Sequence, residues 1–309
     1  MNDAPPGGAR PSGPPTIPGP RPDPEALVDG PLPAGATDCH AHLFGPADRF
    51  PYAEGRGYTP PDAPLEAYLA LLDRLGFARA VLVQGNAHGY DNRVLLDALA
   101  RAPGRLRAVA ITDERVDPRS LREWDRLGVR ALRFHVFAPG REPAYRRGVG
   151  LATLQHFAPL LRELGWHVQV WCEGATLEAA WPALAAAAQG LPVVFDHMCR
   201  FVPGQAPAAF EFLRRLLADG RCWVKLSGAY RCSSRWPDYS EIEAQHAALL
   251  AANPQQVLWG TDWPHPQMTE ATMPDDGRLV NLMLRWTPGA ADRQRLLVDN
   301  PARLYGFMA

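Results

Sequence analysis

The chain has 309 residues, of which 47% are hydrophobic and 21% charged, and its formal net charge is −1. This composition predicts a globular protein with a sizeable core, and the small net charge excludes a general electrostatic attraction to nucleic acid or to an anionic membrane. No apolar run approaches the roughly 20 residues that a membrane-spanning helix needs. The five cysteines form no CxxC pair, so we expect reduced thiols and a cytoplasmic protein.

Residues 1–35 form a leader that is rich in proline and glycine. It lacks the apolar core of a signal peptide, and its composition is typical of a disordered segment. The sequence therefore predicts a disordered leader, residues 1–35, followed by one folded domain, residues 36–309.

Short apolar runs, typical of buried strands, alternate in this domain with stretches whose apolar residues recur at helical spacing. Strands are expected at residues 36–44, 80–84, 108–111, 129–136, 166–172, 192–197, 222–227 and 257–262. Helices are expected at residues 65–75, 93–101, 118–127, 151–164, 177–189, 207–218 and 240–252, and a helical tail closes the chain. Gly76, Gly128 and Gly165 each follow a helix directly, which is a common way for helices to end.

Eight such repeats predict a closed (β/α)8 TIM barrel, whose parallel strands are covered by helices. The alternative is an open, doubly wound sheet. A nucleotide-binding sheet of that kind has a glycine-rich turn after its first strand, and the segment HAHLFG at residues 40–45 does not provide one. The barrel is therefore the favoured fold.

Chemically active side chains lie at the carboxyl ends of the predicted strands, where barrel enzymes have their active sites. His40 and His42 are two residues apart, so a strand directs both imidazoles to one face. His197 ends the sixth predicted strand, and Asp262 ends the eighth. Three histidines and a carboxylate at one end of a barrel predict a catalytic or metal-binding centre.

Five motifs surround these residues: DCHAHLFGP at 38–46, FPY at 50–52, FDHM at 195–198, WVKLSGAYR at 223–231 and LWGTDWPHP at 258–266. Together with the ending DNPARLYG at 299–306, they resemble the amidohydrolase superfamily. The likeness is closest to its branch of 2-pyrone-4,6-dicarboxylate hydrolase-like lactonases, and it covers about residues 37–307.

This resemblance implies that Asp262 is a general base that activates water for attack on a lactone carbonyl. His40, His42 and His197 would polarise that carbonyl, or would hold one divalent metal such as Zn²⁺ together with Asp262. Many members of the superfamily take a fourth histidine from the end of the fifth strand. Here that strand ends in Cys172 and Glu173, so we expect that no metal or other cofactor is required.

The resemblance also implies which residues bind the substrate. Arg133 and Arg231 match positions that bind carboxylates, a task that suits the guanidinium fork, and Tyr58 matches a tyrosine that hydrogen-bonds the same ligand. Two departures affect the choice of dicarboxylate. The loop arginine after the fourth strand is displaced, with Arg141 as the nearest candidate, and Trp171 stands where the pyrone hydrolase has a tyrosine.

Three further candidates come from the ends of strands and the loops that follow them. Gln84 ends the second strand and is expected to face the substrate. Arg200 fits either a substrate clamp or a structural ion pair. His265 fits either a ligand-binding role that also orients Asp262 or a place in a rigid turn.

The sequence therefore predicts a hydrolase that opens a carboxylated lactone: a 2-pyrone-4,6-dicarboxylate-like, muconolactone-like or sugar-acid lactone. A small anionic lactone is the expected partner, and neither nucleic acid nor a membrane is expected. The sequence leaves open whether the protein forms a homo-oligomer. The alternatives are a metal-dependent decarboxylase of an aromatic or muconate acid, a lactone isomerase, and a barrel that only binds its ligand.

Overall fold

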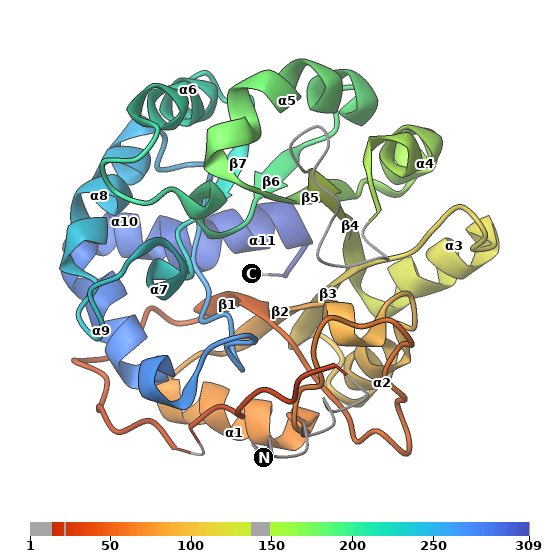
Figure 1. Ribbon diagram of the computed structural model, residues 1–309, viewed down its shortest axis with the longest axis horizontal. Coiled ribbons are helices and arrows are strands. Elements are labelled where there is room, and N and C mark those ends of the chain that lie inside the picture. Colours follow the sequence, from red (N-terminus) through yellow and green to blue (C-terminus); the bar gives the residue numbers. More distant parts are fainter. Residues whose placement is uncertain (1–13, 22, 137–148, 309) are drawn as a thin grey trace, which may run out of the picture.

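The computed structural model describes residues 14–21, 23–136 and 149–308. Its centre is a parallel sheet of eight strands that lie side by side in chain order, from β1 to β8. The Cys39 N–H donates to the Trp259 carbonyl (2.9 Å), so the segment after the last strand joins the first strand. Figure 1 shows the strands as an inner ring with helices around it. The predicted (β/α)8 barrel is confirmed.

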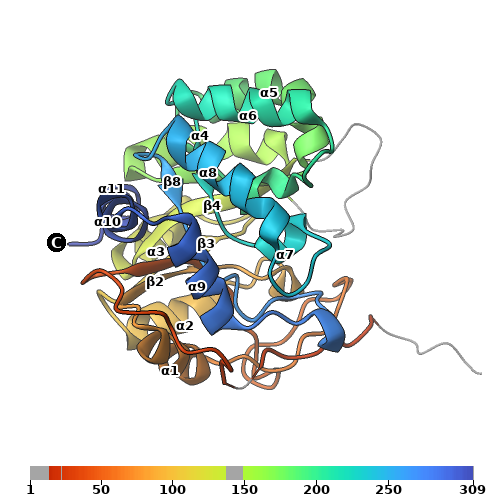
Figure 2. The same cartoon turned by 90° about the vertical axis from the view of Figure 1, so that its left-hand side faces the viewer.

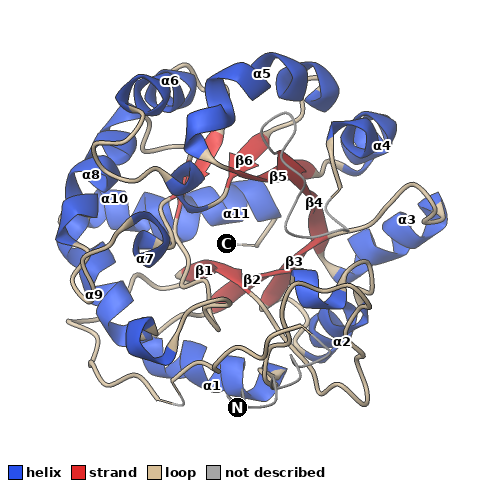
Figure 3. Ribbon diagram, in the orientation of Figure 1, coloured by secondary structure: helices blue, strands red, loops and turns tan. Residues whose placement is uncertain are grey.

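The strands are β1 (Thr37–Ala41), β2 (Arg79–Val83), β3 (Leu106–Ala110), β4 (Val129–Val136), β5 (His167–Cys172), β6 (Val193–Phe195), β7 (Trp223–Lys225) and β8 (Val257–Leu258). The helices are α1 (Leu65–Leu75), α2 (Arg93–Arg101), α3 (Pro118–Leu127), α4 (Leu151–Leu164), α5 (Gly174–Ala188), α6 (Pro207–Ala218), α7 (Ala229–Cys232), α8 (Glu243–Ala252), α9 (Asp276–Trp286), α10 (Ala290–Gln294) and α11 (Asn300–Tyr305). Figure 3 separates helices, strands and loops by colour.

The helices form where their apolar residues make one face against the barrel. In α1, Leu65, Leu72 and Leu75 are buried, and the helix ends at Gly76, whose φ of 87° is accessible to glycine at little cost. The Gly76 N–H donates to the Leu72 carbonyl and satisfies one of the last carbonyls of the helix. No helix within the described ranges is long and apolar enough to cross a membrane.

The last three strands are shorter than the sequence predicts, because the residues that follow them leave the sheet. His197 and Asp262, the last residues of two of the predicted strands, have φ values of 48° and 64°, and Gly228, directly after the other predicted strand, has a φ of 65°. Such left-handed backbone cannot continue a strand. The short helix α7 and the division of the helical tail into α9, α10 and α11 are further details that periodicity does not resolve.

The end of the barrel opposite the strands' carboxyl ends is filled by apolar side chains. Tyr305 and Phe307, from the C-terminal segment, are buried in one cluster with Cys39, Val81 and other strand residues. Figure 1 shows the C-terminus near the barrel axis, and Figure 2 shows α10 and α11 at one end of the molecule with α7 at the other. This closed end leaves the α7 end for chemistry.

Part of the leader lies against the barrel. The Ile17 N–H donates to the Thr59 carbonyl (3.0 Å), and the Glu25 N–H donates to the Asp275 carboxylate (2.5 Å). The composition of the leader does not reveal these hydrogen-bond acceptors of the folded domain, and the disorder of the leader stays a prediction. The rest of the leader, residues 1–13 and 22, lies outside the described residues.

Candidate active site

Segments far apart in the sequence bring the predicted catalytic residues to one end of the barrel. The Asp262 N–H donates to the His40 carbonyl (2.7 Å), and the His42 N–H donates to the Trp263 carbonyl (2.6 Å). These bonds hold the segment after β8 beside the end of β1. The turn after β6 begins at His197 and leads into the same space.

The four predicted catalytic side chains meet around one carboxylate. Asp262 Oδ1 lies 3.3 Å from His42 Nε2 and 3.7 Å from His40 Nε2, and Asp262 Oδ2 lies 3.7 Å from His197 Nε2. The centroid of the His40 ring is 5.0 Å from that of His42 and 4.5 Å from that of His197. All four side chains are buried. The four side chains therefore form one compact cluster.

Two neighbours from the segment after β7 hold the Asp262 carboxylate. Its Oδ2 accepts hydrogen bonds from the Tyr230 hydroxyl (2.6 Å) and from Arg231 Nε (2.5 Å). Burial alone would raise the pKa of Asp262, but the Arg231 guanidinium, together with the His197 imidazole, holds that pKa well below its usual range. The carboxylate stays ionised near neutrality, and its Oδ1 has no hydrogen-bond partner among the described residues.

The histidines are held by their other ring nitrogens. His42 Nδ1 donates to the Val83 carbonyl (2.8 Å), which directs Nε2 at Asp262. His197 Nδ1 lies 2.9 Å from Ser227 Oγ. Burial lowers the pKa of His197 to about 3 and lowers the pKa of His40 well below its usual value. Both rings are therefore neutral at pH 7.

Glycine is required beside His197. Gly228 has a φ of 65°, and a Cβ at this position would lie 2.8 Å from His197 Nδ1. Any larger residue would strain the backbone and displace the ring.

A layer of buried polar side chains lies beneath His40, inside the barrel. Asp196 Oδ2 accepts from Arg133 Nε (3.0 Å) and pairs with Arg133 Nη2 (2.9 Å). Lys225 Nζ donates to Gln169 Oε1 (2.7 Å) and lies 3.3 Å from His40 Nδ1. Burial lowers the pKa of Lys225, whereas Asp196 raises it. Lys225 is the single lysine of the chain, and its place in an apolar strand was the signal for this layer in the sequence.

The predicted substrate arginines have different surroundings. Arg133 is buried against Asp196, whereas Arg231 pairs with Asp262 and also donates from Nη2 to the Pro266 carbonyl (3.2 Å). Arg200 is exposed, and its guanidinium carbon lies 5.4 Å from the centroid of the Trp171 ring. The candidate Arg141 lies outside the described residues.

The other predicted binding residues support the loops that line the site. Gln84 is fully buried, and its Nε2 donates to the carbonyls of Gly89 (3.2 Å) and Asp91 (2.8 Å), which holds the loop after β2. Tyr58 is buried, with its ring centroid 6.3 Å from that of Phe44.

His265 belongs to a hydrogen-bonded chain that ends at Asp262. Its Nδ1 lies 3.1 Å from the Tyr230 hydroxyl, and its Nε2 lies 3.1 Å from Asp276 Oδ1. His265 is fully buried. Because both ring nitrogens contact protein groups, His265 is placed to orient Asp262 through Tyr230. The sequence did not suggest the roles of Tyr230 or Asp276.

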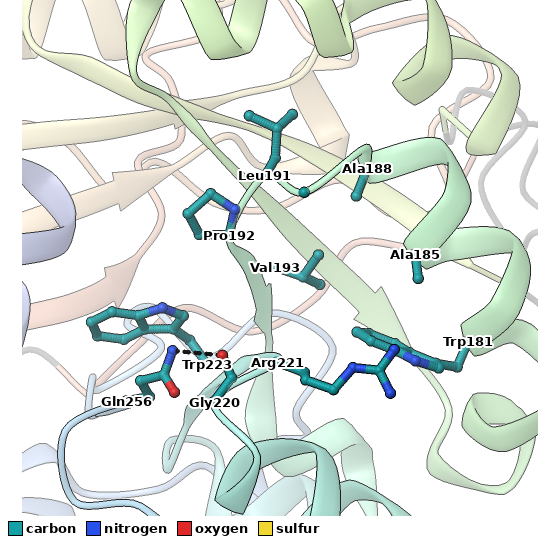
Figure 4. Close-up of a pocket in the computed structure, with 11 residues that line it drawn as sticks. Trp181, Ala185, Ala188, Leu191, Pro192, Val193, Gly220, Arg221, Trp223 and Gln256 are labelled. Carbon is teal, nitrogen blue, oxygen red and sulfur yellow. Dashed lines mark hydrogen bonds between the residues drawn. The ribbon is translucent and has the colours of Figure 1, made fainter.

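Two hollows differ in their relation to this centre. A groove of about 220 Å³ is lined by Arg200, Arg231 and the start of α5 at the carboxyl ends of the strands. A second cavity, of about 450 Å³, lies at the starts of β6 and β7, where Trp181, Arg221 and Trp223 line it (Figure 4). None of the four catalytic candidates lines either hollow, but Arg231, which pairs with Asp262, lines the groove, so the groove is the hollow that approaches the proposed centre.

The comparisons with known proteins agree with this geometry. Residues 37–307 match the family model described as amidohydrolase. The chain is 40% identical over 283 residues to the 4-sulfomuconolactone hydrolase of Rhizobium radiobacter, and the match covers 90% of this chain and 92% of that protein. The chain belongs to the amidohydrolase family.

Two further relatives of this amidohydrolase act on different lactones by name. The 2-pyrone-4,6-dicarboxylate hydrolase of Comamonas testosteroni is 38% identical over 293 residues, covering 89% of this chain and 91% of that protein. The D-galactarolactone isomerase of Agrobacterium fabrum (strain C58) is 32% identical over 280 residues, covering 89% of this chain and 92% of that protein. The relatives thus include lactone hydrolases and a lactone isomerase, which are the main prediction and one of its alternatives.

Solved structures share the barrel of this amidohydrolase. A putative 2-pyrone-4,6-dicarboxylic acid hydrolase from Pseudomonas putida superposes with a TM-score of 0.74 at 32% identity, covering 90% of this chain and 100% of that one. An amidohydrolase from Burkholderia multivorans with bound zinc gives a TM-score of 0.67 at 22% identity, covering 89% of this chain and 100% of that one. At that lower identity the likeness shows the fold alone.

The donor set of this amidohydrolase fits a divalent metal in its composition. His40, His197 and Asp262, three of the four predicted ligands, each offer one atom, and these atoms lie within 4.8 Å of one another. His40 Nε2 and Asp262 Oδ1 are buried and have no hydrogen-bond partner within the part of the chain that the structure describes. Nitrogen and carboxylate ligands are those that Zn²⁺ takes in catalytic sites.

Proposed function

We propose that this amidohydrolase opens the ring of a carboxylated lactone, with water as the nucleophile and Asp262 as the general base. The observation that carries the proposal is the meeting of three imidazoles around one ionised carboxylate whose Oδ1 has no other partner among the described residues. A base that must take a proton from water needs such an available oxygen. The ring oxygen that is released can belong to an enol or to an alcohol, so an enol acid and a hydroxy acid are both compatible as products.

In the proposed reaction, water lies between Asp262 Oδ1 and the ring carbonyl carbon. Asp262 takes the proton as the water oxygen attacks, and the carbonyl oxygen becomes an oxyanion. N–H groups directed at that oxygen stabilise it, and the Nε2 atoms of His40 and His197 are the nearest candidates. When the tetrahedral intermediate collapses, the ring C–O bond breaks, and the proton on Asp262 passes to the leaving oxygen. The product is a ring-opened acid.

The cations around the groove support an anionic substrate. Arg200 and Arg231 line the groove, against one acidic lining residue, Glu173. Guanidinium groups bind carboxylates through paired hydrogen bonds. A carboxylated lactone could form such bonds, and an uncharged lactone could not.

The groove beside Arg231 is the proposed place for the acidic group of the substrate. Arg200 and Arg231 line it, and the first turn of α5 adds backbone N–H groups that favour negative charge. We assign Arg133 chiefly to holding Asp196, and we propose that Tyr58, Gln84 and His265 shape the site through their neighbours. Arg141 remains a proposed ligand of the substrate from outside the described residues.

A metal-free reaction is the favoured form of this proposal. A divalent ion held by His40, His42, His197 and Asp262 would act as a Lewis acid on the carbonyl. The fifth strand ends in Cys172 and Glu173 and supplies no further histidine.

A panel of lactones tests the proposal. The purified protein is incubated with a 2-pyrone dicarboxylate, a muconolactone and a sugar-acid lactone, each with and without its free carboxylate, while a pH-stat records acid release. We expect acid release from at least one carboxylated lactone and at least a tenfold lower kcat/KM for its methyl ester. Equal rates for acid and ester would contradict the anionic substrate, and no acid release from the whole panel would contradict the lactonase.

The lactone isomerase is the second candidate, because a relative 32% identical over most of the chain has that name. An isomerase would convert the lactone to another lactone, so the substrate would disappear without acid release. The decarboxylase alternative requires a bound metal and would release CO₂, which a chelated sample would no longer do. Analysis of products by NMR separates the three reactions.

A further inference from the structure

The hydrogen-bonding role of His40 depends on which of its ring nitrogens carries the proton. A neutral imidazole has one N–H and one lone pair. If Nε2 carries the proton, His40 can donate to the oxygen of a bound carbonyl but cannot bind a metal through that atom. If Nδ1 carries it, the lone pair on Nε2 faces Asp262 and can bind a metal.

Two buried groups compete for His40 Nδ1 at the same distance. Lys225 Nζ and Asp196 Oδ1 each lie 3.3 Å from it. An ammonium group has three N–H donors and no lone pair, so it requires a lone pair on Nδ1, whereas a carboxylate requires a proton there. The identity of the true partner of Nδ1 therefore decides the state of Nε2.

The geometry favours Lys225 as the partner of Nδ1. Lys225 Nζ makes an acceptable hydrogen bond to Nδ1, while Asp196 Oδ1 is left without a hydrogen-bond partner among the described residues. Asp196 Oδ1 also lies 3.6 Å from Lys225 Nζ, which favours the ammonium form of the lysine. Arg133 occupies the other oxygen of Asp196 and holds the carboxylate in place.

The opposite face of the ring is consistent with a donor on Nε2. His40 Nε2 lies 3.7 Å from Asp262 Oδ1, which is too long for a hydrogen bond, and it has no other partner within the described residues. An N–H at this position would point toward Asp262, beside which the proposed reaction places the ring carbonyl.

We propose that Lys225 fixes His40 as the tautomer with the proton on Nε2, which makes His40 a donor to the ring carbonyl and a poor metal ligand. Lys225 is thus a positioning residue that acts through His40. The catalytic part of this inference rests on the proposed lactonase, but the tautomer and the metal affinity do not. A buried lysine, in this account, selects hydrogen-bond catalysis over metal catalysis in a site whose other donors fit a metal.

The tautomer is measured in the unmodified protein. Histidine is labelled with ¹⁵N, two-bond ¹H–¹⁵N correlations are recorded at pH 7.5, and the His40 signals are identified by their loss in His40→Gln. We expect a protonated Nε2 and an unprotonated Nδ1. A protonated Nδ1 would overturn the proposal whatever the activity of the protein.

A variant tests the cause. Lys225→Met removes the ammonium and keeps a similar volume, so Asp196 becomes the remaining partner of Nδ1. We expect the Nδ1–H tautomer, at least a tenfold rise in Zn²⁺ affinity by calorimetry, and a fall of about tenfold or more in kcat with KM changed less than threefold for the best lactone of the panel. Gln169→Met is the matched control, because it removes the other partner of Lys225 but leaves the ammonium beside His40.

The control is expected to keep the Nε2–H tautomer and the Zn²⁺ affinity of the unmodified protein. Unchanged zinc affinity in Lys225→Met, or an equal gain in Gln169→Met, would refute the assignment to Lys225. If Lys225→Met does not fold, as judged by its thermal melt, the tautomer of the unmodified protein still decides. If no lactone is turned over, the tautomer and zinc results stand apart from the failed function.

Discussion

The contact between Tyr230 and Asp262 gives the sharpest test of how the base is held. Tyr230→Phe removes one oxygen, whose proton is donated to Asp262 Oδ2 over 2.6 Å, and leaves the buried ring in place. It also leaves His265 Nδ1 without the hydroxyl that lies 3.1 Å away. The substitution therefore separates the positioning of Asp262 from the packing around it.

The size of the effect follows from the type of hydrogen bond. A hydrogen bond to a charged group contributes about 1.5–3 kcal/mol. If that energy is lost in the transition state, kcat falls by about 10- to 100-fold, since each 1.4 kcal/mol corresponds to about tenfold. The carboxylate also becomes more basic, because it has lost a donor, but its pKa stays below the assay range, so the loss is expected in kcat at every pH tested. KM for the lactone is expected to change by less than about threefold.

Tyr239→Phe is the matched control. Tyr239 is also buried, its ring centroid is 6.4 Å from that of Tyr230, and its hydroxyl has no hydrogen-bond partner within the described ranges. The assay is steady-state kinetics from pH 5 to 9, with urea unfolding of each variant. A Tyr230→Phe enzyme that keeps kcat within twofold would refute the view that Tyr230 orients the base.

Three further predictions use the same assays. Arg200→Met is expected to raise KM for the carboxylated lactone about 10-fold or more with little change in kcat, because the Arg200 side chain lines the groove proposed for the acidic group of the substrate. An unchanged KM would show that Arg200 does not bind the substrate. Arg133→Met is expected to reduce the free energy of unfolding by about 3–5 kcal/mol in urea titrations, because it leaves Asp196 buried without its guanidinium; a loss below about 1 kcal/mol would contradict the buried pair. Burial lowers the pKa of His167 to about 3 and of His246 to about 4, so the unfolded chain takes up these protons first as the pH falls below about 6.5. Each histidine should then reduce the free energy of unfolding by about 2 kcal/mol at pH 5 relative to pH 7.5. A His246→Gln variant that loses as much stability as the unmodified protein between these two pH values would contradict the contribution assigned to His246.

The sequence determines the fold through signals that are local. Apolar runs, amphipathic spacing and terminating glycines such as Gly76 place the main helices and strands, because each depends on neighbours a few residues away. Local signals do not predict where strands β6 and β8 end. There the backbone is left-handed at His197 and Asp262, whereas apolar composition alone predicts a longer strand.

The sequence predicts those parts of the candidate site that lie at the ends of strands. The pair His40 and His42 follows from strand geometry, and its meeting with His197 and Asp262 follows from the barrel. The partners inside the barrel do not follow. Whether Arg133 faces the substrate or Asp196 depends on how side chains from strands 63 residues apart pack in the interior, and no local pattern carries that information.

The contacts that hold Asp262 from behind are also not predictable from local sequence. Tyr230 reaches Asp262 from a short helix after β7, and His265 reaches Asp276 at the start of α9. Each contact depends on the path of a loop, which composition does not fix. The part of the leader from residue 14 onward has partners of this kind too, such as the Asp275 carboxylate.

The central claim is that Asp262 activates the water that opens the lactone. Asp262→Asn keeps the size of the side chain and removes its ability to take a proton, so the most direct measurement is a comparison of single-turnover acid release with binding of the same carboxylated lactone by calorimetry. We expect acid release to fall at least about 1000-fold while the lactone still binds with Kd within about tenfold of the unmodified value. Acid release by Asp262→Asn within tenfold of the unmodified protein would contradict the assignment of the base.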